Sequence, residues 1–292
     1  MKDQLLKALA YDGMVRVFVL DMTQTVQEAH LRHDTWHTST AALGRTLVAT
    51  ALLAANLKGD DRLSVEVAGS GPSGRILADG DGQGHVRGYI QNPHVALELN
   101  AQGKLDVAGA VGLPGTLTVR KYIADSDHPF SGQVPLISGE LAEDFTYYMA
   151  LSEQTPSSIG LSVLVNPDES VAAAGGFMIQ VMPGITEEVI VALEEKIASL
   201  GRFSDLLDQG KSLEELLEIL VGKDNARILD RQDVSFTCPC SKDRFANSLK
   251  MIGNEELQAM IDEDQGAETV CHYCNEKYHF SIAELQALME GE

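Results

Sequence analysis

Four cysteines near the C-terminal end are the only cysteines of this 292-residue chain. They form a C-x-C pair and a C-x-x-C pair, namely Cys238 with Cys240 and Cys271 with Cys274. Two closely spaced pairs supply the four soft ligands of a tetrahedral zinc ion, because each short turn can point both of its sulfurs the same way. The spacing therefore predicts a zinc site at these cysteines. The alternative is that the four cysteines are buried and inert, but this would not explain why they occur as two closely spaced pairs.

The cysteines could also form disulfides in a secreted protein. The N-terminal residues, MKDQLL, lead into a mixed amphipathic segment with no apolar signal core, so we expect a cytoplasmic protein with reduced thiols. His272 and His279 lie near the cysteines and could replace a thiolate as a zinc ligand. With four cysteines available, we expect these histidines to have a surface or packing role.

Zinc holds its cysteine ligands as thiolates, which are also the form that oxidants attack. Within each pair, the second sulfur is near enough to react with a sulfenic acid on the first, which would give a disulfide and release the ion. Oxidation and metal binding therefore exclude each other. The sequence predicts a redox-active centre as well as a metal site.

The chain is strongly acidic, with 43 Asp and Glu residues against 22 Lys and Arg residues and a formal net charge of −21. Nucleic acids and anionic membrane surfaces are bound by clustered basic side chains, so neither is an expected partner. The longest apolar run, Leu47–Ala55, is well short of the roughly 20 residues of a membrane-spanning helix. A hydrophobic content of 44% indicates a folded protein.

Residues 1–182 predict one α+β domain with a large antiparallel sheet. A first strand is expected at Met14–Leu20, and a helix from a cap at Thr38 or Ser39 to Leu57. Between Arg62 and Val119, alternating runs separated by turn residues predict antiparallel strands at LSVEVA, RILAD, HVRGYI, VALEL and TLTV. A helix at Leu141–Glu153 and strands at 160–165 and 171–181 complete the domain.

Residues 183–232 predict a linker of short, acid-rich amphipathic helices. Two apolar stripes define its helices: Ile190, Leu193, Ile197 and Leu200, then Leu213, Leu216, Leu217 and Leu220. Ser212 and Glu215 form a capping box before the second stripe. Ordinary core packing also explains such stripes. Because the helices lie between the large domain and the cysteine module, a change in the module has a direct route to them.

Residues 233–292 predict a small zinc-binding module. Ser241 and Asn254 are candidate helix caps, strands are expected at Glu268–Val270 and Lys277–Phe280, and Ser281 with Glu284 forms a capping box for a last helix. A module of this size gains about 3–5 kcal/mol from its core, whereas zinc binding contributes about 10–16 kcal/mol. We therefore expect the module to unfold when it loses the ion.

Two glycine-rich motifs match known ligand-binding patterns but lack the required context. Gly69–Gly74 fits G-x-G-x-x-G, yet a strand is expected after it where a phosphate-binding turn needs a helix. Asp79–Gly84 resembles the start of a calcium loop, but Ile90 stands where the bidentate glutamate belongs. We expect tight turns at both. The sequence contains no G-x-S-x-G motif, so it gives no support for acyl-transfer chemistry.

Six segments of the chain are characteristic: RHDTWHTSTAALGRTL (Arg32–Leu47), GKLDVAGAVG (Gly103–Gly112), SGELAEDFTYY (Ser138–Tyr148), AAGGFMIQVMPG (Ala173–Gly184), CPCSKDRF and CHYCNEKYHF. In these segments the chain resembles the redox-regulated 33 kDa chaperonin family, bacterial cytosolic holdases, and the likeness covers nearly the whole length. The resemblance implies zinc bound by all four cysteines in a reduced, inactive form. It implies disulfides Cys238–Cys240 and Cys271–Cys274 in an active form that dimerises and holds unfolding client proteins without ATP.

The leading hypothesis is therefore a stress-response chaperone, without catalytic turnover, whose sensor is the zinc site. Oxidation would release zinc, unfold the module and expose the apolar stripes of residues 186–222 as a binding surface. A thiol-disulfide oxidoreductase that uses the C-x-x-C pair is the alternative function. A third possibility is a purely structural zinc ribbon used for docking, which oxidation would only inactivate.

Overall fold

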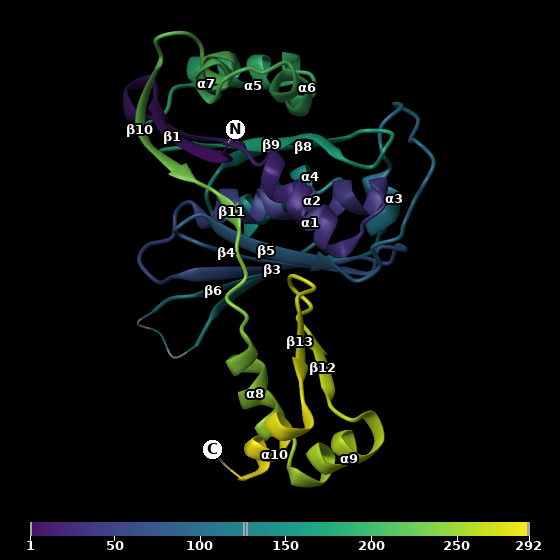
Figure 1. Ribbon diagram of the computed structural model, residues 1–292. Coiled ribbons are helices and arrows are strands. Elements are labelled where there is room, and N and C mark those ends of the chain that lie inside the picture. Colours follow the sequence, from purple (N-terminus) through teal and green to yellow (C-terminus); the bar gives the residue numbers. More distant parts are fainter. Residues whose placement is uncertain (1, 125, 127, 291–292) are drawn as a thin grey trace. The chain divides into compact units, whose positions relative to one another are not determined.

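The structure is a computed structural model that describes residues 2–124, 126 and 128–290. The chain divides into two compact units, Met1–Thr237 and Cys238–Glu292 (Figure 1). Both units combine helices with antiparallel strands, so the predicted α+β fold class is confirmed. Within the described ranges, no helix is long and apolar enough to cross a membrane.

A five-stranded antiparallel sheet of the first unit has the strand order β10-β1-β2-β9-β8. Its strands are β1 (Gln4–Ala10), β2 (Val15–Asp21), β8 (Ser157–Val165), β9 (Val171–Val181) and β10 (Ala226–Asp233). The strand predicted at Met14–Leu20 is β2, and it is the second strand. The composition of β1, QLLKALA, favours a helix, but its pairing with β2 and β10 and the burial of Leu5 and Leu6 stabilise a strand.

A six-stranded sheet of the same unit has the order β11-β5-β4-β3-β6-β7, in which β11 runs parallel to β5. Its strands are β3 (Arg62–Ala68), β4 (Arg75–Asp81), β5 (His85–Ile90), β6 (Thr116–Tyr122), β7 (Phe130–Pro135) and β11 (Ser235–Phe236). Four of the alternating runs predicted as strands are confirmed as β3 to β6. The fifth, VALEL, is wrong, because only Val95 of it is buried and the Leu97 N–H donates to the Thr38 hydroxyl instead of a neighbouring strand.

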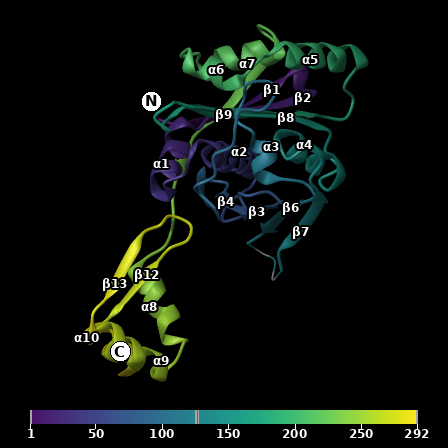
Figure 2. The ribbon, with the colours of Figure 1, turned by 90° about the vertical axis from the view of Figure 1, so that its right-hand side faces the viewer.

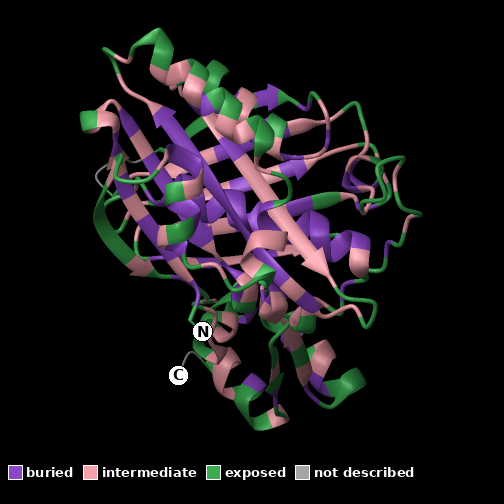
Figure 3. Cartoon of the chain, turned by 90° about the horizontal axis from the view of Figure 1, so that it is seen from above, coloured by how far each residue is buried: buried purple, intermediate pink, exposed green. Residues whose placement is uncertain are grey.

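Four helices belong to the layer between the two sheets (Figure 1). They are α1 (Thr23–His33), α2 (His37–Ala54), α3 (Val107–Val111) and α4 (Ala142–Leu151). The helix α2 is buried along nearly its whole length, and Figure 3 shows the buried residues gathered in the central strands and helices. Neither Thr38 nor Ser39 caps α2, because the helix begins at His37 and both hydroxyls bond to the loop at 92–97.

Three helices cover the outer face of the five-stranded sheet (Figure 2). They are α5 (Glu187–Ser199), α6 (Phe203–Asp208) and α7 (Leu213–Val221). All residues of the two stripes predicted for the linker pack here except Ile190, and Leu216 and Leu220 are fully buried with Leu6, Val17 and other residues of the sheet. The capping box of α7 is confirmed, since Ser212 and Glu215 bond reciprocally. After α7 the chain enters β10, a strand that the sequence did not predict.

The described part of the second unit, residues 238–290, contains a two-stranded hairpin and three helices. They are α8 (Lys242–Lys250), α9 (Asn254–Asp264), β12 (Ala267–Val270), β13 (Lys277–Phe280) and α10 (Ile282–Glu290). The predicted caps Ser241 and Ser281 are confirmed, whereas Asn254 is already inside α9, which Gly253 precedes with a positive φ. Among the residues described up to 290, the core of this unit contains five buried hydrophobic residues: Leu249, Leu257, Ile261, Phe280 and Leu285. So small a core stabilises the unit weakly.

The substitution Leu216→Ala should lower the free energy of unfolding of the first unit by about 2–5 kcal/mol, because it opens a cavity under α7 at a fully buried position. Urea denaturation followed by circular dichroism measures this change. Glu218→Ala, at an exposed position of the same helix, is the control and should change stability by no more than about 0.5 kcal/mol. Equal effects of the two substitutions would contradict the docking of α7.

Candidate metal centre

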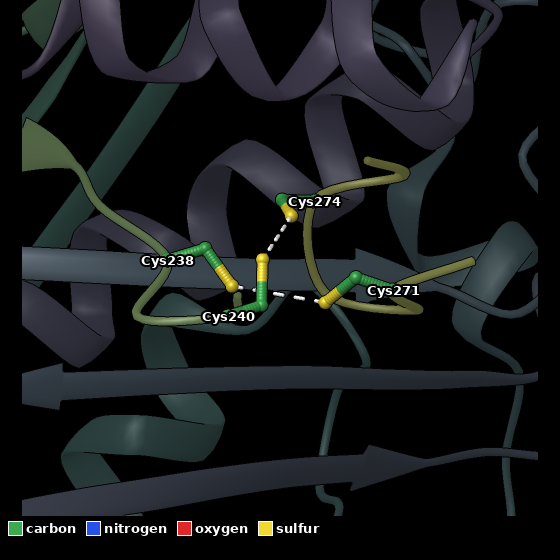
Figure 4. Close-up of side chains that lie close together, drawn as sticks. All are labelled: Cys238, Cys240, Cys271 and Cys274. Atoms are coloured by element: carbon green, nitrogen blue, oxygen red, sulfur yellow. Dashed lines mark hydrogen bonds between the residues drawn. The ribbon is translucent and has the colours of Figure 1, made fainter. Parts of the chain in front are cut away.

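Two loops of the second unit bring the four cysteines together (Figure 4). Cys238 and Cys240 precede α8, and Cys271 and Cys274 occupy the turn between β12 and β13. All four Sγ atoms lie within 4.8 Å of one another. The structure thus places every predicted zinc ligand in one cluster.

The first loop is fixed by the start of α8. The Ser241 hydroxyl accepts a hydrogen bond from the Arg244 N–H at 3.3 Å, which caps the helix. The Arg244 guanidinium donates to the Pro239 carbonyl oxygen at 2.9 Å, between the two cysteines. Both bonds hold the C-x-C segment against the end of the helix, so its sulfurs keep a defined direction.

The second loop is a tight turn that closes the hairpin. The N–H of Asn275 donates to the Cys271 carbonyl oxygen at 2.7 Å, and the N–H of Cys271 donates to the Glu276 carbonyl oxygen at 2.9 Å. Asn275 has a φ of 61°, a left-handed conformation that asparagine tolerates better than most residues. The turn reverses the chain within the C-x-x-C segment and directs both sulfurs toward the first loop.

The sulfur positions fit a tetrahedral metal site. The Sγ atoms of Cys238 and Cys271 are 3.7 Å apart, and those of Cys240 and Cys274 are 3.4 Å apart. In a tetrahedral site with Zn–S bonds of about 2.3 Å, neighbouring sulfurs are about 3.8 Å apart, whereas a disulfide is about 2.05 Å. All four cysteines are free thiols. Four sulfur donors in this arrangement favour zinc over harder cations.

Because two of these thiols are buried, they become negatively charged thiolates only when a cation lies close to them. Cys271 and Cys274 are 6% and 3% exposed, and burial raises the pKa of both thiols. Without a cation they remain protonated at neutral pH. A bound metal ion supplies the positive charge that stabilises four thiolates at close range.

One aromatic side chain adds a hydrogen bond that the sequence did not predict. The Tyr278 hydroxyl lies 3.2 Å from the Cys240 Sγ, and its ring is 5.2 Å from the ring of Phe245. The hydrogen bond to Cys240 raises the pKa of Tyr278, so the phenol keeps its proton and can donate it to a thiolate. The only signal for this role was that Tyr278 lies in the strand following Cys274.

The two histidines near the cysteines are not part of the cluster that the described residues form. His279 places its Nδ1 3.4 Å from the carboxylate of Glu268, its partner on the neighbouring strand. The Lys242 ammonium group donates a hydrogen bond to the Glu284 carboxylate and lowers the pKa of that carboxyl to about 2. These pairs lie on the surface of the unit, and the four thiols are the candidate metal ligands among its described residues.

Each of the two glycine-rich motifs of the first unit contains a turn between strands, as expected, although Asp79–Asp81 forms the end of β4. Gly69–Gly74 joins β3 to β4, and a Cβ atom at Gly69 would lie 2.0 Å from the Val111 carbonyl oxygen. These glycines therefore permit the close approach of α3. Asp81 accepts hydrogen bonds from the N–H groups of Gln83 and His85, which closes the hairpin between β4 and β5.

A family model for the Hsp33 protein matches residues 3–281. The chain belongs to the Hsp33 family. It is 55% identical to the 33 kDa chaperonin of Enterococcus faecalis over 290 residues, which are 99% of this chain and 97% of that protein. The 33 kDa chaperonin of Staphylococcus carnosus is 54% identical, over 99% of this chain and 98% of that protein.

The crystal structure of an Hsp33 homologue, the 33 kDa chaperonin of Thermotoga maritima, has the same fold with a TM-score of 0.93. The two sequences are 35% identical, and the structural match covers 100% of this chain and 99% of the Thermotoga maritima chain. The resemblance inferred from the six sequence segments is therefore confirmed, and it includes the unit that carries the cysteines.

Zinc added to the reduced, metal-free chain should protect the amides of α8, α9 and α10 from hydrogen exchange. Its binding free energy of about 10–16 kcal/mol exceeds the about 3–5 kcal/mol available from a core of this size. Mass spectrometry measures the exchange, and the amides of α2 serve as the internal control. Equal protection of the second unit with and without zinc would show that the cation is dispensable for its fold.

The substitution Tyr278→Phe should weaken zinc binding about tenfold or more, since it removes a donor to the Cys240 thiolate but keeps the ring beside Phe245. Competition with a chromophoric chelator measures the affinity. Tyr122→Phe, which removes a phenol of the first unit, is the control and should leave the affinity unchanged. If both variants bind zinc as tightly as the unaltered chain, the hydrogen bond has no influence on the ion.

Proposed function

We propose that this chain is a redox-regulated chaperone that binds unfolding proteins and prevents their aggregation under oxidative stress. In the proposed cycle, the reduced form holds zinc and is inactive, and the oxidised form is active without ATP. The observation that carries the proposal is the cluster of four free thiols, 3.4 and 3.7 Å apart across the two loops, in a member of the Hsp33 family. Hsp33 is a chaperone family, so no catalytic turnover is expected.

The chemical step of the proposal is a two-electron oxidation of each cysteine pair. A thiolate attacks the O–O bond of a peroxide, which leaves a sulfenic acid, and the second thiol of the pair displaces water to form the disulfide. The formation of each disulfide thus reduces one molecule of hydrogen peroxide to two molecules of water. We propose the pairs Cys238–Cys240 and Cys271–Cys274, each within one loop, so that both links between the loops are lost.

Loss of these links would remove the main stabilisation of the second unit. Its core of five buried hydrophobic residues is small, and we propose that the oxidised unit unfolds. The chain leads directly from this unit through β11 and β10 to α7. We therefore propose that residues 183–232 act as the linker that responds to the switch.

Release of the linker would expose apolar surface on both partners of a packed interface. The helices α5–α7 would expose their leucine stripes, and the outer face of the sheet would expose side chains such as Val17, Val19 and Phe177. Contiguous apolar surface of this kind binds other proteins that expose apolar segments. The acidic composition would keep this open form soluble.

The alternative function, a thiol-disulfide oxidoreductase, has less support. In such enzymes the C-x-x-C motif lies between a strand and a helix of a βαβ unit. Here Cys271 and Cys274 lie in the turn of a two-stranded antiparallel hairpin, with the other two cysteines beside them. This context is typical of a metal site. We further propose a cytoplasmic protein that dimerises when oxidised and binds neither nucleic acid nor membranes.

Peroxide-treated, zinc-free protein should suppress the aggregation of a heat-denatured client, and reduced zinc-bound protein should not. Light scattering of the client measures suppression, with zinc release followed in the same samples. A variant with Cys238, Cys240, Cys271 and Cys274 replaced by serine tests whether oxidation acts at these thiols, because it should not respond to peroxide. Equal suppression by both forms of the unaltered chain would refute the redox switch, and turnover in insulin reduction would favour the oxidoreductase.

A further inference from the structure

A cavity of about 400 Å³ lies in the first unit between the sheet and the proposed linker. One wall is formed by residues 159–165 of β8. A second wall comes from linker residues within 197–204, where α5 ends and α6 begins. Residues within the segment 99–105 form a third wall. We call this the linker cavity, because it exists only while the linker is docked on the sheet.

Two direct contacts join the linker wall to the sheet. The Ser162 hydroxyl of β8 donates a hydrogen bond to the Ser204 hydroxyl at 2.7 Å. The Phe203 ring packs against the Phe177 ring of β9, with the ring centroids 5.7 Å apart. Both linker residues are buried. These contacts define the shape of the linker cavity in the form of the chain whose thiols are free.

The lining of the linker cavity is rich in apolar side chains. Leu161 of β8, Leu105 of the third wall, and Leu200 and Phe203 of the linker all belong to it. The volume lies within the range of about 300–1,000 Å³ that is usual for small-molecule sites, which combine apolar walls with a few polar groups. The linker cavity can therefore bury a short alkyl chain.

The charge of the linker cavity is opposite to that of the whole protein. Its lining contains Arg45, Lys104 and Arg202 but no aspartate or glutamate, in a chain with 43 acidic residues. Lys104 and Arg202 are exposed, and neither has an acidic partner in the described ranges. Arg45 is paired with Glu140, and its buried Nε has no hydrogen-bond partner among the described residues. These groups favour a ligand with a negative charge and hydrogen-bond acceptors.

We propose that the linker cavity binds a small anionic amphiphile, namely a carboxylate on an unbranched alkyl chain, such as octanoate. The alkyl chain contacts the apolar lining, and the carboxylate is attracted by Lys104 and Arg202. The ligand is a small molecule and not a client protein. Its binding to the reduced chain is therefore compatible with a reduced form that is inactive as a chaperone.

The position of the linker cavity gives such a ligand a regulatory effect. The ligand contacts β8 and the linker together, so it loses part of its site when the linker leaves the sheet. A ligand that prefers one of two states shifts the population toward that state. The amphiphile therefore opposes linker release, and linker release lowers its affinity in return. This effect rests on the proposed function, whereas binding to the reduced chain does not.

Isothermal titration calorimetry on the full, reduced, zinc-bound chain tests the site. Octanoate, kept below the concentration at which it forms micelles, should bind saturably at a single site. Octanol lacks the charge, octylammonium reverses it and acetate lacks the alkyl chain, so each should bind about tenfold more weakly or worse. Acetate or octylammonium binding as tightly as octanoate would refute the proposed ligand class.

A double variant, Lys104→Gln with Arg202→Gln, tests the charge of the linker cavity. It should weaken octanoate binding about tenfold and leave octanol binding unchanged. The matched control, Lys58→Gln with Lys223→Gln, removes two exposed cations that are not in the lining, and it should bind octanoate as the unaltered chain does. Equal octanoate affinities of the two double variants would show that the lining cations do not recognise the ligand.

Hydrogen exchange of the reduced chain measures the effect on the linker. At about ten times its dissociation constant, octanoate should slow exchange of the α5 and α6 amides about tenfold, because it stabilises the docked state from which these amides must open. The amides of α8, in the second unit, are the control and should exchange at the same rate. Unchanged exchange of α5 and α6 despite saturable binding would overturn the regulatory effect.

The oxidised chain separates failure of this inference from failure of the proposed function. Oxidised, zinc-free protein should bind octanoate about tenfold more weakly or worse than the reduced chain, because its linker has left the sheet. If it suppresses client aggregation yet binds octanoate as tightly as the reduced chain, the coupling to the linker is refuted and the chaperone function stands. If it does not suppress aggregation, the proposed function fails, and calorimetry on the reduced chain still decides the site.

Discussion

We propose that the contact between the two cysteine loops is the interaction on which the second unit depends. Among its described residues, the core of that unit contains five buried hydrophobic side chains, and two of the sulfurs precede α8 while the other two lie in the turn of the hairpin. A larger core would make the thiol cluster one contribution among many. Because the core is small, the state of four sulfur atoms can decide whether this part of the chain is folded.

The same reasoning explains why the first unit can remain folded when the second changes. Its core lies between two sheets and includes the nearly fully buried helix α2. The helices α5–α7 form a separate cluster on the outer face of one sheet. The molecule therefore combines a stable body with a peripheral layer that has its own interface. Loss of that layer would uncover apolar surface without removing the central core.

The cluster of four thiols could be predicted from the sequence because each pair of sulfurs is set by one short turn. The helix caps at Ser212, Ser241 and Ser281 were predictable for the same reason. Contacts between distant segments could not be predicted in this way. Tyr278 reaches Cys240 across 38 positions of sequence, and β10 has mostly exposed residues with no alternating pattern, so nothing local in either segment indicates its partner.

The pairing of β1 with β10 also bears on how the chain is synthesised. Gln4 and Asp233, which bond across this pair, are separated by 229 positions. A ribosome therefore releases the N-terminal strand long before the strand that covers its edge exists. During that interval β1 presents an open edge to other nascent chains, and early folding must proceed without its last strand. A protein that would protect others from aggregation thus passes through a vulnerable stage of its own during translation.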